Sequence, residues 1–238
     1  MLAKSKFGVC SILAFVIIAL MLIAMAGVDA YAHGVDDTTR AFLQNNSGVH
    51  VLPFMYIGAK HMVTGSDHLL FLVGVLFFLR STQDVILYVS MFTVGHSITL
   101  MTGVLANIQV NAYLIDAIIG LSVIYKGFDN LGGFKHYFGT QPDPKKAVLI
   151  FGLFHGFGLA TKIQEFELPA EGLATNLLSF NLGVEIGQFL ALMFILLAIN
   201  FWRRFDSFTR FATATNTALM SAGFMLVGMQ LTGYFLNY

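Results

Sequence analysis

The chain has 238 residues, of which 57% are hydrophobic and only 11% are charged, and its mean hydropathy is +0.76. Soluble domains carry about 25% charged residues, so this composition predicts an integral membrane protein that contacts lipid. The formal net charge is zero, which gives no electrostatic reason to expect nucleic acid as a partner.

Residues 1–32 have the features of a signal peptide. Lys4 and Lys6 precede a long apolar core, and AYA at 30–32 is the small-x-small pattern of a cleavage site. The core is longer than that of most signal peptides, so an uncleaved membrane anchor is the alternative. Cleavage would make His33 the N-terminus, on the periplasmic side of a bacterial inner membrane.

Six apolar segments follow, each about long enough for a helix that crosses the hydrocarbon layer. Backbone groups in lipid must bond within their own helix, so these segments are predicted to be helical. The predicted spans are 54–79, 84–105, 111–131, 146–163, 173–201 and 211–236. They predict an all-α integral membrane fold, a six-transmembrane-helix bundle that forms one domain over residues 33–238.

Charges between the spans predict the orientation of the bundle. If His33 is outside, the basic residues that fall inside are Arg80, Lys126, Lys135, Lys145, Lys146, Arg203, Arg204 and Arg210. The basic residues that fall outside are Arg40, Lys60 and Lys162. This excess of basic residues inside follows the positive-inside rule.

The span 54–79 contains the stretch HMVTGSDH just before a long apolar run. A charged residue in lipid is costly, so its presence there suggests a function. His61 and His68 are seven residues apart, on one face of a continuous helix. Asp67 would point about 120° away from them, unless Gly65 breaks or bends the helix.

Polar residues in four further spans fall at similar depths. Counting about 1.5 Å per residue, these residues lie in the outer half of the membrane or near its midplane. They are His96 and Ser97, Asp116, His155, and a stripe of Asn181, Glu185 and Gln188. We therefore predict one polar site that faces the outside.

Nitrogen and oxygen ligands are expected in this site, because the only cysteine, Cys10, lies in the leader. Imidazole and carboxylate suit Ni, Co, Zn or Fe(II) rather than Cu(I). The predicted metal ligands are His33, His61, Asp67, His68, His96, His155 and Glu185, with Ser97, Asn181, Gln188 and Asp116 as supporting polar groups. The alternative is that each histidine bonds a neighbouring carbonyl, and that the polar stripe makes ordinary interhelical hydrogen bonds.

Four motifs resemble the HupE/UreJ family of membrane proteins. HMVTGSDHLLFL has the family's HX5DH pattern, and FTVGHSITL, FGLFHGFGLA and FNLGVEIGQ follow in the family's order. The resemblance implies a nickel or cobalt permease linked to hydrogenase or urease maturation. The nickel branch carries FHGxAHGxE, but Leu159 and Lys162 stand here at its second histidine and its glutamate. The chain therefore resembles the second branch, in which His96 and Glu185 are candidates to replace those ligands.

Two functions from different classes fit this pattern, and the transporter is favoured over the enzyme. In the permease, His61 captures a divalent ion, the deeper ligands hold it and Glu185 neutralises it. The alternative is an intramembrane zinc hydrolase, with Asp67 or Glu185 as the base and Ser97 orienting water. A third reading is a scaffold that delivers metal to a partner complex. No nucleotide-binding motif is present, so ATP is not expected as the energy source.

Overall fold

The computed structural model describes residues 48–164 and 171–237, and every regular element in these ranges is a helix. The helices are α3 (Val51–Thr64), α4 (Ser66–Leu76), α5 (Thr82–Leu105), α6 (Ala112–Asn130), α7 (Gly133–Phe138), α8 (Pro144–Gln164), α9 (Leu173–Trp202) and α10 (Ser207–Asn237). The predicted all-α class is confirmed for this part of the chain. The predicted leader, its cleavage site and His33 lie outside the described residues.

Four of the described helices, α5, α8, α9 and α10, are long and apolar enough to cross a membrane. They support the prediction of an integral membrane protein. Helix α6 has 19 residues but includes Asp116, Lys126 and Asp129, which lower its apolar character. The first predicted span is divided into α3 and α4, of 14 and 11 residues. Six crossings therefore remain a prediction.

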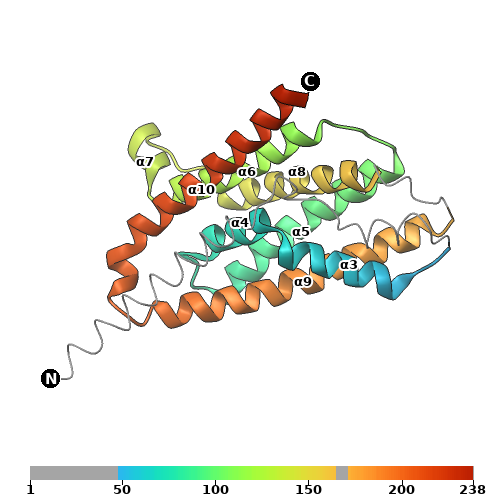
Figure 1. The fold of residues 1–238 in the computed structure, drawn as a ribbon. Coiled ribbons are helices and arrows are strands. Elements are labelled where there is room, and N and C mark those ends of the chain that lie inside the picture. The colour runs from blue at the N-terminus through green and yellow to red at the C-terminus, as the bar shows by residue number, and fades with distance from the viewer. Residues whose placement is uncertain (1–47, 165–170, 238) are drawn as a thin grey trace.

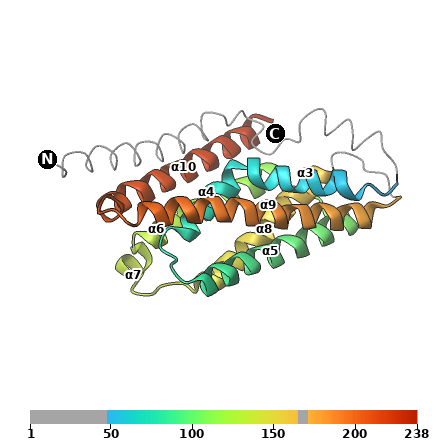
Figure 2. The same cartoon turned by 90° about the horizontal axis from the view of Figure 1, so that it is seen from below.

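The long helices associate in three main pairs, α3 with α9, α5 with α8 and α6 with α10 (Figures 1 and 2). Residue contacts show that the first two pairs are parallel and the third is antiparallel. For example, Gly183 and Gly187 meet Met55 and Ala59 in that order. If the chain crosses the membrane six times, these pairs are spans one and five, two and four, and three and six. Alternating crossings would make the first two pairs parallel and the third antiparallel, as observed.

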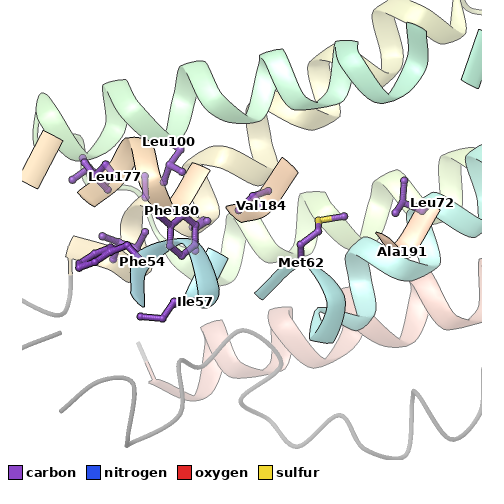
Figure 3. Packing of buried hydrophobic residues seen from close by; sticks show 13 residues of the cluster. Phe54, Ile57, Met62, Leu72, Leu100, Leu177, Phe180, Val184 and Ala191 are labelled. Carbon is purple, nitrogen blue, oxygen red and sulfur yellow. The ribbon is translucent and has the colours of Figure 1, made fainter. Parts of the chain in front are cut away.

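Glycines let the paired backbones come close together. A Cβ on Gly58 or Gly183 would overlap the backbone of the facing helix in the α3–α9 pair. Small residues have this role in lipid, where helix association depends on van der Waals packing. Apolar side chains complete the contact, as Figure 3 shows for Phe54 and Ile57 of α3 near Phe180 of α9.

The α5–α8 pair has its closest contact beside the histidines. A Cβ on Gly156 would collide with the Thr99 hydroxyl and the His96 carbonyl oxygen. The Thr99 Oγ1 donates a hydrogen bond to the Leu153 carbonyl at 2.7 Å, which joins the two helices at the same level. This contact sets the spacing between His96 and His155.

Gly156→Ala should therefore destabilise the folded protein by about 1–3 kcal/mol, because a methyl group must displace a packed backbone. Gly228→Ala in α10 is the matched control, since no atom lies within 4 Å of the place that its added Cβ would take. The control should be neutral or gain about 0.5–1 kcal/mol of helix stability. Thermal unfolding in detergent measures both, and equal melting temperatures for the two variants would contradict the packing argument.

Candidate metal site

Gly65 separates α3 from α4 and so places Asp67 and His68 in the first turn of a new helix. Its backbone is extended, with φ −68° and ψ 106°. Its N–H donates to the His61 carbonyl at 2.9 Å, and its own carbonyl accepts from Leu69 N–H at 3.1 Å. A carboxylate in the first helical turn is favoured by the helix dipole. The break thus turns Asp67 toward the histidines and stabilises its charge.

Asp67, His68 and His155 form a compact group of three metal-ligating side chains. One ligand atom from each lies within 4.8 Å of the others. Their exposed fractions are 1%, 2% and 1%. The group lies where the start of α4 meets the middle of α8. Two imidazoles and a carboxylate at this spacing could close around one divalent ion.

His68 is the centre of a wider histidine cluster. The centroid of its ring lies 5.0 Å from that of His155, 5.1 Å from His61 and 6.4 Å from His96. His61, in the last turn of α3, is half-buried and lies on the side of the cluster toward the start of α9. His96 is 1% exposed, and neither of its ring nitrogens has a hydrogen-bond partner in the described part of the chain. A buried polar group of this kind calls for a ligand or water.

Hydrogen bonds set the tautomers of two histidines in a form suited to metal binding. The Nδ1 of His155 lies 2.7 Å from the Phe151 carbonyl oxygen, so Nδ1 must carry the proton that it donates. The Nδ1 of His68 lies 3.2 Å from the Asp67 carboxylate, which also favours a proton on Nδ1. In both rings the lone pair then belongs to Nε2. Metal-binding histidines are commonly oriented in this way by a carbonyl or a carboxylate.

The structure brings five of the predicted ligands together, namely His61, Asp67, His68, His96 and His155. It does not bring Glu185 to them, because this side chain is exposed on α9. His33 lies outside the described residues.

The supporting polar groups have other contacts. The Ser97 hydroxyl donates to Asn181 Oδ1 at 3.0 Å, and the Thr93 hydroxyl donates to Gln188 Oε1 at 2.9 Å. These bonds join α5 to α9 beside the cluster. Asp116 instead accepts a 2.7 Å hydrogen bond from the Lys162 ammonium, which joins α6 to α8. The interhelical alternative is thus observed for part of the predicted polar stripe.

Sequence reasoning did not identify the aromatic residues around the histidines. The ring of Phe92 lies 4.9 Å from that of His155, and the ring of Phe71 lies 5.7 Å from it. Phe151 contacts Phe71 at 5.8 Å. The chain contains 24 phenylalanines, so composition does not single these out. The local sequence feature that could have indicated them is their helical spacing from the histidines: Phe71 is three residues after His68, and Phe151 is four residues before His155.

Comparison with known proteins identifies one family. The family model described as HupE / UreJ protein matches residues 37–238. No curated protein and no solved structure gives a significant match.

The Asp116–Lys162 pair, whose carboxylate is buried, predicts a strong effect of removing the cation. Lys162→Met should destabilise the protein by about 3–5 kcal/mol, because it leaves a carboxylate buried without its cation. Asp116→Asn combined with Lys162→Met should recover most of that loss. Thermal unfolding of the single and double variants measures the difference, with Lys135→Met on exposed α7 as the control. A double variant as unstable as Lys162→Met would show that the pair is not the cause.

Proposed function

Because this chain belongs to the HupE / UreJ family, whose members are accessory proteins related to nickel and cobalt transport, we propose that it is a permease for a divalent transition-metal ion. The observation that carries the proposal is the buried group of Asp67, His68 and His155. A carboxylate and imidazoles enclosed by apolar helices have little use as packing groups, since burying them costs free energy. A dication that binds there would offset this cost.

The proposed ion is the transported substrate, and each ligand has a distinct role. His61 receives the ion from the outer side, because it is the half-buried member of the cluster. Asp67, His68 and His155 hold it, and His96 supplies a further imidazole. Family membership favours nickel or cobalt, and the same ligands also suit zinc or iron(II). His33, if cleavage exposes it, could add its amine and ring at the entrance.

Glu185 is not part of the proposed ligand set, since its side chain is exposed while the cluster is buried. Of the residues assigned to the hydrolase alternative, Asp67 lies in the cluster, but Glu185 and Ser97 do not take the expected positions. Glu185 was one of two candidate bases, and Ser97, expected to orient water, donates to Asn181 instead. Metal delivery to an enzyme-maturation partner remains compatible with a permease, because the imported ion must pass to a receiver.

The proposed orientation places His61 toward the periplasm of a bacterial inner membrane. The start of α9 and the end of α8 would then face outside, and the basic residues Arg80, Lys145 and Lys146 would face inside. Cleavage after residue 32 would give the mature N-terminus this same outer location.

Alanine substitutions test the shared site. His68→Ala, His155→Ala and His96→Ala should each lower both the affinity for nickel or cobalt and the uptake into proteoliposomes, by about 10-fold or more. Bound metal per purified protein and the uptake rate are the two measurements. Metal should also raise the wild-type melting temperature, since a ligand that binds the folded state stabilises it.

His136→Ala is the matched control, because His136 is exposed on α7 and remote in sequence from the cluster motifs. It should leave metal content and uptake unchanged. If all three cluster variants kept the wild-type metal affinity, the histidines would be structural residues and the proposed site would be wrong.

Cysteine labelling tests the orientation. In a Cys10→Ser background, Gln109→Cys in the α5–α6 connection and Lys145→Cys at the start of α8 place single thiols at exposed positions. An impermeant reagent added to intact cells should label Gln109→Cys and not Lys145→Cys. The reverse pattern would mean that the histidine cluster opens toward the cytoplasm.

A further inference from the structure

A pocket of about 220 Å³ lies on the far side of the aromatic residues from the histidine cluster. Phe71 and Phe151 line it and contact each other at 5.8 Å, and the ring of Phe71 also lies 5.7 Å from that of His155. Its other walls come from the end of α4, the start of α5, the end of α6 and the start of α8. Those helix ends carry the residues expected to face the cytoplasm. Phe92, which contacts both His155 and Phe71, completes an aromatic layer between the cluster and the pocket, with Phe71 and Phe151 on the pocket side.

Helix α6 contributes the polar side of this pocket. Tyr125 and Asp129 are four residues apart, so they share one helix face. The Tyr125 ring lies 5.1 Å from that of Phe151, and its buried hydroxyl has no hydrogen-bond partner in the described residues. Asp129 is buried, and its two oxygens bind the Lys126 ammonium at 2.5 Å and the Gln141 amide at 3.0 Å. A hydroxyl and a carboxylate therefore follow the aromatic layer in order.

We propose that this pocket is the inner, release-side vestibule of the ion path, with Asp129 as its cation-binding group and the three phenylalanines as the constriction above it. The inference rests on the proposed permease function. Hydrophobic constrictions of this kind can gate a pore by excluding water. The phenylalanines would keep the histidine cluster closed to the inner side until a ring moves.

The size of the pocket suits an ion that regains water there. The pocket, of about 220 Å³, has room for several water molecules. The ion could therefore exchange imidazole ligands for water directly below the constriction.

The Lys126–Asp129 pair makes the vestibule a weak binding site. An arriving dication must displace the ammonium from the carboxylate, so part of the gain in attraction is lost. A site on a conduction path has to bind weakly enough to release the ion. The Lys126 ammonium then returns to Asp129 and favours departure of the ion toward the cytoplasm.

Two variants test the vestibule in proteoliposomes that contain a nickel-sensitive dye. Asp129→Asn should lower nickel uptake by about tenfold and leave nickel affinity at the histidine cluster unchanged. Ala147→Cys, in a Cys10→Ser background, places a half-buried thiol in the pocket wall. This thiol can be modified after the protein has folded. Modification by a bulky thiol reagent from the inner side should block uptake, again with nickel binding retained.

Matched controls are Asp143→Asn, an exposed carboxylate that does not line the pocket, and modified Lys145→Cys, which lies outside it. Both should transport like the wild type. Wild-type uptake by modified Ala147→Cys, or by folded Asp129→Asn, would overturn the vestibule while leaving the permease intact. If Asp129→Asn loses nickel binding through misfolding, the Ala147→Cys result decides. A wild-type protein that neither binds nor transports nickel would instead remove the proposed function.

Discussion

The cost of burying polar groups among apolar helices is the constraint on which this structure depends. An aspartate and several histidines lie almost fully enclosed, yet they belong to helices that must also pack in lipid. Two features reconcile these demands. Gly65 precedes a new helix with Asp67 in its first turn, where the helix dipole offsets part of the cost of the charge. Gly156 lets α8 approach α5 until His96 and His155 belong to one cluster.

The same constraint applies at Lys162, in the last turn of α8. A lone ammonium at this buried position would be costly. Here Asp116 on the neighbouring helix α6 compensates it at 2.7 Å. The pair also joins α6 to α8, the helix that carries His155. Lys162 is therefore part of a structural link between two helices.

Local patterns predicted most of the cluster but not its borders. The HX5DH motif and the histidines of FTVGHSITL and FGLFHGFGLA come together as predicted. They could be predicted because the glycines that break a helix or allow a close helix contact are visible in the sequence. Glu185 was predicted from its spacing with Asn181 and Gln188. At 100° per residue, the Glu185 side chain leaves the helix about 40° from Asn181 and about 60° from Gln188. This difference is enough to turn Glu185 out of the interface between α9 and its neighbours. The Asp116–Lys162 pair and the phenylalanine layer depend on which helices become neighbours, and no local period encodes that.

In the proposed permease, the arrangement of the polar groups addresses a conflict between capture and release of the ion. Imidazole and carboxylate ligands that capture a scarce ion also slow its release, since each 1.4 kcal/mol of binding free energy lowers the dissociation constant about tenfold. A second, weaker station reduces this problem only if it lies close to the first and water can reach it. Phe71 contacts His155 and lines the pocket with Asp129, and Phe151 lines that pocket beside Phe71. In the proposed path, one aromatic layer separates the histidine cluster from a carboxylate already paired with Lys126, and movement of these rings would open the way between them.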